Sequence, residues 1–348
     1  MARVSINIVT WNAMRFLPEA LESIEKQTFG DFNIIIVDNG STDGTVQYIR
    51  EYYPQITLIR NVKNLGFAHG HNQAMRLAIA KWPAEELDNR FVLVTNQDIL
   101  LKEDFLENLI AEAEKQKQAG SFGGKLYKAF FSQGEDGFEE TIKSDILDST
   151  GLLVYKSRRV VDRGAGETDQ KQYDEARDIF GVSGAIPMYR ASALQSVRFR
   201  DEFFDDDFFC YKEDIDLAWR LRLAGWHSRY VPEAMAHHYR GAYSPEKSSW
   251  LKTVMARRKR SHLVNFRSFV NHYFVLIKNE YFSNLLVHLP WFVLYELKKN
   301  IYTFFFEPKT YWQGKVHVIK NLSLMMKKRK FNFSKARVGA KEMRNWIG

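Results

Sequence analysis

The sequence has one cysteine, Cys210, in 348 residues. No disulfide can therefore form within the chain, which fits a reducing compartment. Long hydrophobic runs are absent too, since no stretch approaches the roughly 18–20 uncharged apolar residues of a membrane-spanning helix. The N-terminal stretch MARVSINIVTWNAM lacks the apolar core of a signal peptide and is typical of a first strand.

Two common phosphate-binding signatures are also missing. The turn after the first strand, TWNAMRF, contains no Gly-x-Gly-x-x-Gly, and no glycine loop leads into Gly-Lys-Ser/Thr. A dinucleotide-binding Rossmann site and a P-loop are therefore disfavoured. The same turn lacks the glycine-rich, arginine-containing loop that is typical of nucleotidyltransferases.

Acidic residues are scarce in the last third of the chain. Residues 246–348 contain 21 Lys and Arg against 5 Asp and Glu, whereas residues 1–245 contain 29 against 37. An acidic body thus carries a strongly basic tail. Such a tail indicates an anionic partner, whether nucleic acid, anionic lipid or a lipid-linked phosphate.

Strand and helix patterns alternate at short spacing over the first 116 residues. Nearly continuous apolar stretches, as in FNIIIVD, indicate strands buried on both faces of a parallel sheet. Strands are expected at 4–12, 32–38, 56–61 and 90–98, and helices at 16–28, 45–53, 70–82 and 102–116. This order predicts βαβ units and a doubly wound sheet.

Polar side chains gather where these strands end. Ligands of such sheets bind outside the carboxyl ends of the strands, so we expect one crevice there. The residues concerned are Thr10, Trp11 and Asn12; Asp38 and Asn39; Asn64 with Gly66; and Asn96 with Asp98.

The second half of the body is less regular. A loop-rich stretch with strand-like fragments spans residues 148–174, and a mostly buried helix is expected to begin near Glu213 and to end at Gly225. Glu213, Asp214 and Asp216 crowd the first turn of that helix. One acid would suffice to offset the helix dipole, so three of them indicate a catalytic role for at least one.

Seven motifs in order resemble the inverting family 2 glycosyltransferases of GT-A fold, and are closest to rhamnosyltransferase-like members. They are TWN, VDNGSTDGT, NLGFAHGHNQA, TNQD, VSGA, FFCYKEDIDLAWR and AHHYRG, and they run from about Ala2 to Tyr243. The resemblance implies a GT-A α/β fold with a mostly parallel, doubly wound sheet. We expect this domain to span residues 1–244, with a basic, aromatic-rich helical region at 245–348.

The resemblance also implies a divalent metal site for Mg²⁺ or Mn²⁺. Asp98 is its expected carboxylate ligand and His238 its second ligand, although the adjacent His237 is not separable from His238 by sequence alone. The family usually has Asp-x-Asp, whereas this chain has Asn96-Gln97-Asp98. Asn96 can hydrogen-bond a ribose, but only Asp98 brings a full ligand charge. The alternatives are a strand-end cap for Asp98 and a hydrogen-bonded histidine.

A nucleoside-diphosphate sugar, a dTDP- or UDP-sugar, is the expected donor. Asp38 should accept from a pyrimidine N3–H, with turn formation as its alternative role. Trp11 should stack on the base, unless it is a core aromatic. The remaining expected contacts are Thr10, Asn12, Gly66, which permits close backbone approach, Asn72, which faces the nucleotide from its helix, and Asn96.

Asp214 matches the position of the general base that takes the proton of the acceptor hydroxyl. Partial burial and its acidic neighbours should raise its pKa toward the working range. The implied function is transfer of a sugar, L-rhamnose being one candidate, to a glycan or lipid-linked acceptor in cell-surface polysaccharide synthesis. The alternative is a non-catalytic nucleotide-sugar-binding or membrane scaffold of the same fold, against which the presence of Asp98 and Asp214 speaks.

The basic tail interleaves aromatic residues with Lys and Arg. This pattern is typical of helices that lie at an anionic membrane surface. We therefore expect the protein to be cytoplasmic and peripheral at the inner face of the cell membrane, with a soluble helical appendage as the alternative. The chain carries no recognised nucleic-acid-binding motif, so nucleic acid is not an expected partner.

Overall fold

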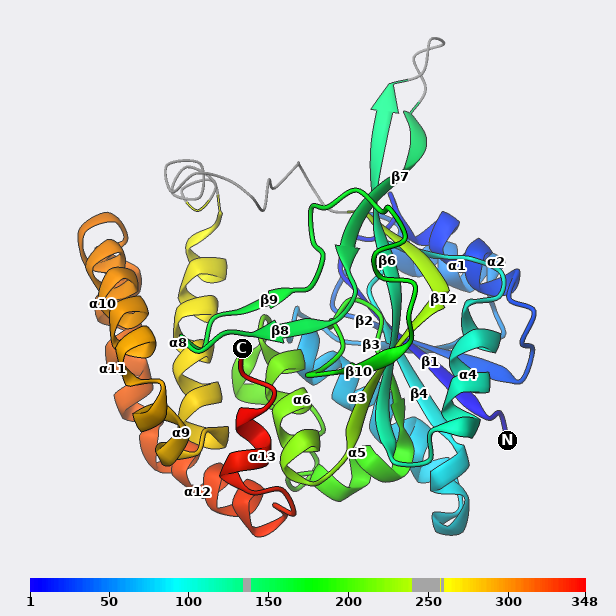
Figure 1. The fold of residues 1–348 in the computed structure, drawn as a ribbon. Coiled ribbons are helices and arrows are strands. Elements are labelled where there is room, and N and C mark those ends of the chain that lie inside the picture. The colour runs from blue at the N-terminus through cyan, green and yellow to red at the C-terminus, as the bar shows by residue number, and fades with distance from the viewer. Residues whose placement is uncertain (134–138, 240–256, 258–259) are drawn as a thin grey trace.

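The computed structural model describes residues 1–133, 139–239, 257 and 260–348. An α/β body built on one large sheet is followed by a group of helices at its side (Figure 1). The strand order along the sheet is β10-β12-β6-β11-β4-β1-β2-β3. These strands are β1 (Val4–Thr10), β2 (Phe32–Asp38), β3 (Thr57–Arg60), β4 (Phe91–Thr95), β6 (Ala119–Gln133), β10 (Arg177–Ile179), β11 (Met188–Arg190) and β12 (His227–Tyr239).

The first half of the sheet is parallel, as predicted. β1 lies between β2 and β4 and pairs in parallel with both, and β3 extends the sheet beyond β2. Alternate residues of β2 enter opposite cores, Ile36 on one face and Ile35 and Val37 on the other. The continuous apolar sequence is therefore the consequence of burial on both faces.

Helices cover both faces of this sheet, which makes it doubly wound. The core on one face takes side chains from α1 (Leu17–Glu25), α2 (Thr45–Tyr52) and α4 (Phe105–Lys115). The core on the other face takes them from α3 (Phe67–Lys81), α5 (Ala191–Val197) and α6 (Glu213–Leu223). Every helix and strand predicted within residues 1–116 is present, with ends shifted by a few residues.

The second half of the sheet is mixed. β11 runs antiparallel to both β4 and β6, while β12 is parallel to β6. Two further strands pair at this side, β5 (Ile99–Leu101) with β12 and β7 (Glu139–Ser149) with β6. A separate hairpin is formed by β8 (Leu152–Val154) and β9 (Val160–Asp162).

The C-terminal helices share a hydrophobic core with the body. They are α8 (His262–Asn279), α9 (Phe282–Val287), α10 (Leu289–Phe306), α11 (Pro308–Lys320), α12 (Leu322–Ser334) and α13 (Ala340–Arg344). Phe269 and Phe274 of α8 and Met325 of α12 pack in one cluster with Trp219 and Leu223 of α6. The expected helical region is thus present, but it is packed onto the body rather than appended to it.

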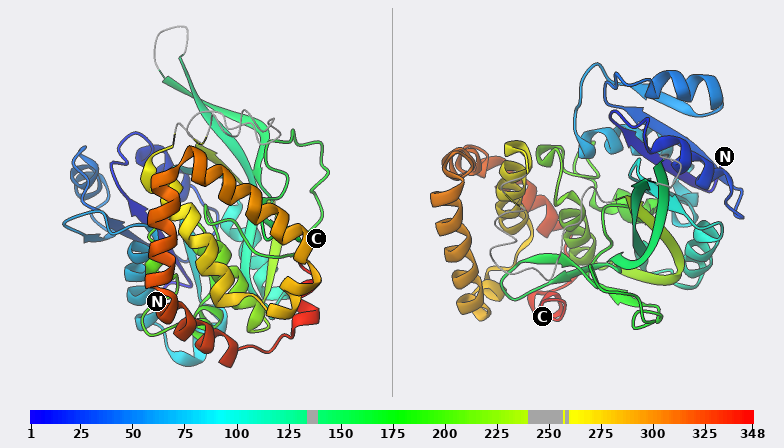
Figure 2. Two further views of the ribbon diagram at one scale, coloured as in Figure 1. Left: turned by 90° about the vertical axis from the view of Figure 1, so that its left-hand side faces the viewer. Right: turned by 90° about the horizontal axis from the view of Figure 1, so that it is seen from above.

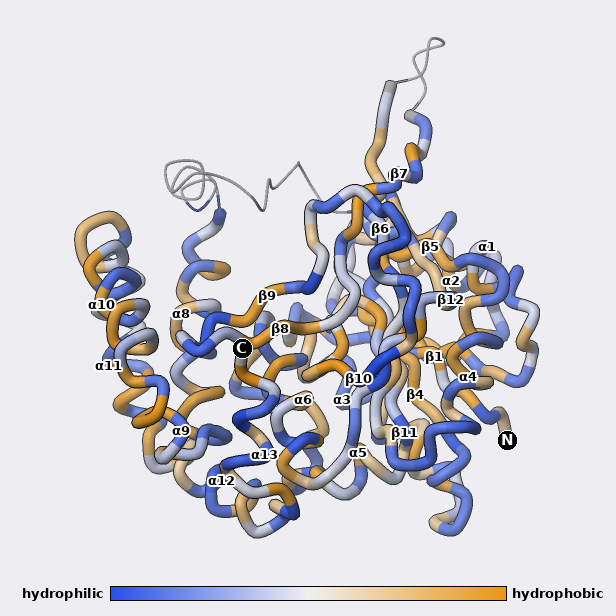
Figure 3. The backbone as a smooth tube through the Cα atoms, viewed as in Figure 1, coloured by the Kyte–Doolittle hydropathy of each residue, from blue (hydrophilic) through white to orange (hydrophobic). Residues whose placement is uncertain are grey.

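The outermost helices are α10 and α11, as the side view in Figure 2 makes clear. Along the tube of Figure 3, hydrophobic segments recur on these two helices although they lie at the edge of the molecule. Within residues 1–133, 139–239 and 260–348, we find no helix that combines the length and the hydrophobicity needed to cross a bilayer.

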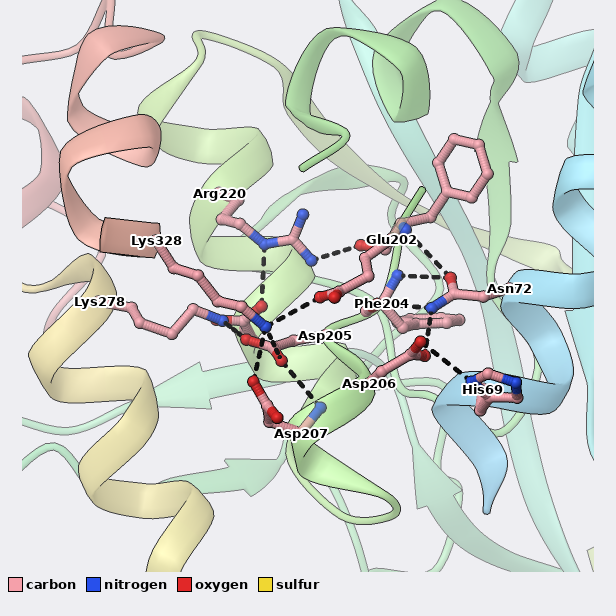
Figure 4. Close-up of polar contacts among 12 residues, drawn as sticks. His69, Asn72, Glu202, Phe204, Asp205, Asp206, Asp207, Arg220, Lys278 and Lys328 are labelled. Carbon is pink, nitrogen blue, oxygen red and sulfur yellow. Dashed lines mark hydrogen bonds and ion pairs between the residues drawn. The ribbon is translucent and has the colours of Figure 1, made fainter. Parts of the chain in front are cut away.

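A buried ion network joins the C-terminal helices to the body (Figure 4). Lys278 of α8 binds Asp205 and, at 2.7 Å, Asp216 of α6. Lys328 of α12 lies 2.6 Å from the other oxygen of Asp205 and 2.9 Å from Glu202. Burial would raise the pKa of Asp205, but the two lysines hold it well below its usual range. Charges buried this deeply depend on one another for stability.

Replacing Asp205 by Asn should therefore destabilise the protein by about 3–5 kcal/mol, because Lys278 and Lys328 each lose a buried partner. Urea unfolding followed by circular dichroism measures the change. Asp201→Asn is the matched control, since that aspartate pairs with Arg198 while 74% exposed, and should cost less than about 1 kcal/mol. Equal stability of the two variants would show that the network does not hold the helices.

Candidate active site

Strand pairing brings Asp98 beside His238. β5 begins at Ile99 and pairs antiparallel with β12, in a register that sets Ile99 opposite His238. The backbone of Asp98 accepts a hydrogen bond from the Tyr239 amide. As a result the Asp98 Oδ1 atom lies 3.5 Å from His238 Nε2. The carboxylate and the imidazole expected as metal ligands are therefore neighbours.

Asp148 of β7 orients the imidazole from its other side. Its Oδ2 atom lies 2.8 Å from His238 Nδ1, and Asp148 is fully buried. Burial alone would lower the pKa of His238, but the hydrogen bonds and charges of Asp148 and Asp98 raise it to about 9. A carboxylate on the far nitrogen is the usual partner of a metal-binding histidine, because it fixes the ring and its tautomer.

His237 faces different surroundings. Its ring stacks on Tyr127 with centroids 5.5 Å apart. Burial and the charges of Lys143 and Lys102 lower its pKa to about 4. Because side chains alternate along a strand, β12 can direct only one of the two histidines toward Asp98, and that one is His238.

The donor set at this point suits a hard cation that keeps water or phosphate ligands. The Asp98 side chain is 23% exposed, so its carboxylate remains accessible from solvent. Across the described part of the chain, no group of three or more His, Cys, Asp and Glu side chains is arranged to hold a metal ion. A two-residue site fits Mg²⁺ or Mn²⁺ bound together with a nucleotide, since such ions take much of their coordination from phosphates.

Asp38 closes the loop that follows its own strand. Its Oδ2 atom accepts hydrogen bonds from the amides of Gly40 and Ser41, at 3.1 and 3.0 Å, and its Oδ1 atom accepts one from the Thr10 hydroxyl at 3.2 Å. Asp38 and Thr10 are both fully buried. The turn-forming role weighed for Asp38 is thus the one that the structure displays, and its contact with a nucleobase stays a prediction.

Trp11 and Asn12 sit at the open side of this loop. The Trp11 side chain is 55% exposed, so the alternative of a core aromatic is wrong. Its amide donates to Gln97 Oε1 at 2.9 Å, which ties the loop after β1 to the loop after β4. Asn12 has a φ of +50° and accepts from the Thr42 amide at 2.9 Å. The indole is therefore free to stack on a planar ligand.

Gly66 and Asn72 are both in close contact with other parts of the chain, and the contact of Gly66 with a nucleotide stays a prediction. A Cβ atom on Gly66 would lie 2.5 Å from the Phe209 carbonyl oxygen, so this glycine permits close approach of the chain itself. Asn72 is fully buried, accepts from the amides of Phe203 and Phe204, and donates to Asp206 (Figure 4). Its side-chain amide is hydrogen-bonded to residues 203–206, so it does not face a nucleotide in this structure.

Asp214 lies in the first turn of α6 and faces the turn that contains Gly184. Its Oδ2 atom accepts from the Gly184 amide at 2.9 Å. An added Cβ on Gly184 would come within 3.1 Å of that carboxylate, so the small residue leaves room for it. Burial raises the pKa of Asp214, against the lowering effect of its backbone hydrogen bonds. A held carboxylate with a raised pKa is suited to accept a proton.

The three acids of the α6 first turn have distinct surroundings. Asp216 is fully buried and bonded to Arg220, Lys278 and Asn279, so it is structural. Burial and the neighbouring charge of Asp214 raise the pKa of Glu213 to about 8. Its Oε2 atom finds no hydrogen-bond partner within the described ranges. Asp214 is thus the partly exposed carboxylate of the three.

Two backbone hydrogen-bond contacts connect the segment that contains Asp98 with the segment that binds Asp214. The Asn96 amide donates to the Ala185 carbonyl at 2.9 Å, and Ala185 follows Gly184, which binds Asp214. The Asn96 side chain has intermediate exposure beside this junction. Residues 96–98 are therefore connected to the metal-type pair, to the loop of the exposed indole and, through residues 184 and 185, to the base-type carboxylate.

Sequence reasoning missed Asp148, Gln97 and Gly184 as parts of the site. Asp148 lies on a strand that the pattern did not reveal, so no signal pointed to it. Gln97 stands between the two residues of the predicted metal motif and was passed over. Gly184 belongs to the VSGA motif, and its small size next to an acidic helix start was the available signal.

Comparison with known proteins gives this site a context. The model of the family described as glycosyl transferase family 2 matches residues 5–197. These residues include the sheet from β1 to β11 and the loops that carry Trp11, Asp38 and Asp98.

Two curated relatives extend the match beyond the family model. An N-acetylglucosaminyl-diphospho-decaprenol L-rhamnosyltransferase of Mycobacterium tuberculosis is 27% identical over 244 residues, covering 67% of this chain and 74% of the relative. Rhamnosyltransferase WbbL of Escherichia coli is 25% identical over 280 residues, covering 76% of this chain and 96% of the relative.

Solved structures agree on the fold. The structure of S. aureus TarS 1-349 in complex with UDP-GlcNAc matches 99% of this chain and 92% of its own, with a TM-score of 0.52 and 14% identity. GalNAc-T7 with UDP, GalNAc and Mn²⁺ matches 99% of this chain and 56% of its own, with a TM-score of 0.60 and 13% identity. The GT-A architecture expected from the sequence is confirmed.

Removing Asp98 should weaken the Mn²⁺-dependent part of nucleoside-diphosphate binding, because its carboxylate is the anionic member of the Asp98–His238 pair. Calorimetry with UDP or dTDP, with and without Mn²⁺, measures this. Asp98→Ala and Asp148→Asn should each weaken the metal-dependent binding by about 10-fold or more. The exposed Asp104→Ala is the control and should bind normally. Unchanged Mn²⁺ dependence in Asp98→Ala would rule out the ligand role.

Proposed function

Because the chain belongs to glycosyl transferase family 2, we propose that it transfers a sugar from a nucleoside-diphosphate donor to a glycan or lipid-linked acceptor, with inversion at the anomeric carbon. The observation that carries this proposal is the set of contacts that connects a metal-type pair, Asp98 with His238, to a base-type carboxylate, Asp214, through the Asn96–Ala185 backbone hydrogen bond.

The donor is proposed to be a dTDP- or UDP-sugar, with L-rhamnose as the sugar. Two curated relatives named as rhamnosyltransferases support this choice, and one of their names specifies a decaprenol-linked diphosphate acceptor. The exposed indole of Trp11 offers a stacking surface for a pyrimidine base. Products of this kind would serve the synthesis of cell-surface polysaccharide.

Asp98 and His238 would hold a divalent cation, Mg²⁺ or Mn²⁺, in this proposal. When bound, such an ion neutralises the charge that develops on the leaving diphosphate. Asp148 keeps the His238 ring oriented with Nε2 toward Asp98. Asn96 occupies the first position of the motif, where the family commonly has an aspartate. Asp98 therefore supplies the carboxylate of the motif.

Asp214 would act as the general base. The acceptor hydroxyl loses its proton to a carboxylate oxygen of Asp214 while its oxygen bonds to the anomeric carbon, and the bond from that carbon to the nucleoside diphosphate breaks. Burial, which raises the pKa of Asp214, brings it closer to the neutral working range. The Gly184 amide fixes one oxygen, which leaves the direction of the carboxylate defined.

A non-catalytic scaffold of the same fold is the alternative. Such a protein would need neither an oriented histidine beside Asp98 nor a carboxylate with a raised pKa at the helix start. The buried Asp148–His238 contact argues for a working site. Burying two titratable groups is costly, and this pair holds the imidazole with its other nitrogen toward Asp98. A non-catalytic scaffold is therefore the less favoured of the two functions.

We also propose that the protein works at the cytoplasmic face of a membrane. The outer helices carry many exposed apolar residues, here named the apolar face. Its members on α9 to α11 include Phe282, Leu286, Trp291, Leu294, Leu297, Ile301, Phe305, Trp312 and Ile319, each at least 48% exposed. A patch of this extent on the surface of a protein marks an interaction site.

The charges around the apolar face suit an anionic lipid surface. Exposed lysines flank it at Lys298, Lys309, Lys320, Lys327 and Lys330. The two acids between residues 282 and 334, Glu296 and Glu307, are both largely buried and paired with basic residues. Part of the basic charge of the tail is not available, since Lys278 and Lys328 are buried in the ion network. Apolar contact is therefore proposed as the main attachment.

Asp214→Asn should lower the transfer rate by roughly 100-fold or more, since general-base catalysis typically contributes that much. Binding of the donor with Mn²⁺ should stay close to normal. In the wild type, kcat/KM should fall on the acid side at a higher pH than the usual pKa of aspartate, because the base works only when deprotonated and its pKa is raised. A variant that keeps more than about a tenth of the wild-type rate would exclude Asp214 as the base.

The combined variant Trp291→Ser, Leu294→Ser and Leu297→Ser should reduce sedimentation with liposomes by about 10-fold or more, because three exposed apolar groups on α10 are lost. Wild-type binding should largely persist in 1 M salt, where the Debye length is about 3 Å. The control combines Val62→Ser and Ile142→Ser, which are exposed elsewhere. Equal loss in both variants, or complete release by salt, would contradict the assignment.

A further inference from the structure

A pocket with a volume of about 300 Å³ lies where the segment around α13 meets the body. The end of α6, the start of β12 and the α13 segment form its walls, and α13 lies beside α6 in Figure 1. Its lining residues are Arg222, Gly225, Trp226, His227, Val338, Glu342, Met343, Asn345 and Trp346. The volume is at the lower end of the range of small-molecule sites, so the pocket suits a small ligand or one unit of a larger one.

The wall formed by the α13 segment is fixed at both of its ends. Before the helix, the Arg337 amide donates to the Leu223 carbonyl at 2.7 Å. After the helix, the Gly348 amide donates to the Val154 carbonyl at 2.9 Å. Met343, on the helix itself, is 1% exposed and belongs to the hydrophobic core that α6 and α8 share. The pocket is therefore part of the packed structure and is present before any ligand binds.

Among the described residues, Arg222 is a buried cation without an ion pair, and it lines the pocket. It is 4% exposed, and its guanidinium carbon lies 3.6 Å from the centre of the Trp346 ring. Its Nε atom donates to the Phe180 carbonyl at 3.1 Å, and its Nη2 atom donates to the Ile179 carbonyl. Its Nη1 atom makes no hydrogen bond in the described part of the chain, yet solvent still reaches it. That nitrogen is therefore a donor available to a ligand.

The other polar groups of the pocket include both donors and acceptors. Glu342 and Asn345 are exposed residues on and directly after α13. Asp178 holds the His227 ring at its Nδ1 atom, 2.9 Å away, which leaves Nε2 for another partner. Burial lowers the pKa of Arg222 to about 10, against the raising effects of the Asp178 and Glu342 charges. Because these carboxylates partly offset the arginine, the pocket suits a neutral polar ligand better than an anion.

Two indole rings and two aliphatic side chains supply the apolar part of the lining. Trp226 is held by its Nε1 atom, which donates to the Ser196 hydroxyl at 2.9 Å. Trp346 is held by the guanidinium that lies over it. Val338 and Met343 add the aliphatic surface. A ligand that matches this lining presents C–H groups beside several hydroxyls, and a sugar ring has both.

We propose that this pocket binds one sugar unit of a glycan, at a site separate from the catalytic one. Arg222 lies on the last turn of α6 and Asp214 on the first, about 12 Å apart along the helix axis. His227 begins β12 and His238 lies near its end, roughly 35 Å apart along the strand. One sugar cannot occupy both sites. In a transferase, the pocket would hold a unit of the glycan that is remote from the reacting end.

This inference goes beyond the proposed function, because it concerns binding alone. Saturation-transfer difference NMR on the full chain tests it, with methyl α-L-rhamnoside, methyl β-D-glucoside and methyl N-acetyl-β-D-glucosaminide as probes. At least one of them should bind with a Kd of about 1 mM, because so small a ligand makes few contacts. A signal from none of the three would overturn the proposal.

Substitutions in the lining locate the signal. Glu342→Ala should weaken binding by about 10-fold and Asn345→Ala by about 5-fold, because each removes a hydrogen-bonding group. Both side chains are exposed, so these variants should fold. Lys341→Ala is the matched control, since Lys341 is exposed on the same helix but does not line the pocket, and it should bind normally. Arg222→Lys keeps the charge without the fork of donors and should also lose the signal. Unchanged binding in both exposed variants would contradict the assignment.

Three further arms separate the sources of the ligand. Methyl glycosides should bind as well as the free sugars, whereas binding of the free sugars alone would indicate a free metabolite and overturn the proposal. Displacement of the sugar by inorganic phosphate would indicate an anion site and overturn it too. The signal should persist when UDP and Mn²⁺ are added, and a signal that they abolish belongs to the catalytic site. Failure of the wild type to bind UDP would instead count against the proposed function, and the Glu342→Ala result would still decide the inference.

Discussion

The arrangement of the molecule depends on two adjacent carboxylates that face opposite ways. Asp206 binds Asn72 and His69 of α3, on the body, whereas Asp205 binds Lys278 and Lys328, on α8 and α12 (Figure 4). Buried charges are tolerated only when they are paired, so α8 and α12 cannot shift without leaving Asp205 or its two lysines unpaired in an apolar interior. This constraint fixes α6, and with it Asp214, relative to both parts.

The fold of the first 116 residues was predictable because local pattern and tertiary burial agree there. Strands such as FNIIIVD are apolar throughout, and each is followed by a turn and an amphipathic helix. The long strand β6 escaped prediction, since its sequence AGSFGGKLYKAFFSQ contains three glycines and buries Lys125. Lys125 is stable inside only because Asp169 and Asp174, some 45 residues away in sequence, approach it. No local pattern can report such a partner.

The role of a site residue was predictable where the type of its side chain indicates that role. It was less predictable where the role depends on which residues pack around it. Asp98 and His238 lie side by side as expected, and both expectations came from the motifs that resemble family 2 glycosyltransferases. The sequence could not separate His238 from His237, since the choice depends on which face of β12 meets Asp148. Asn72 was misread for the same reason. Its amide has four good partners in a segment 130 residues later.

The C-terminal region is an integral part of the folded body rather than a separate tail. Its inner surface completes the core around Trp219 and supplies lysines to the ion network. Its outer surface exposes apolar side chains that a free protein in water has no reason to present. The same helix, α10, has Trp291 on the outside, whereas its Lys299 is largely buried and pairs with Glu296. The membrane-bound acceptor proposed above would make use of this combination, because its lipid would stay in the membrane while its sugar reaches the proposed base.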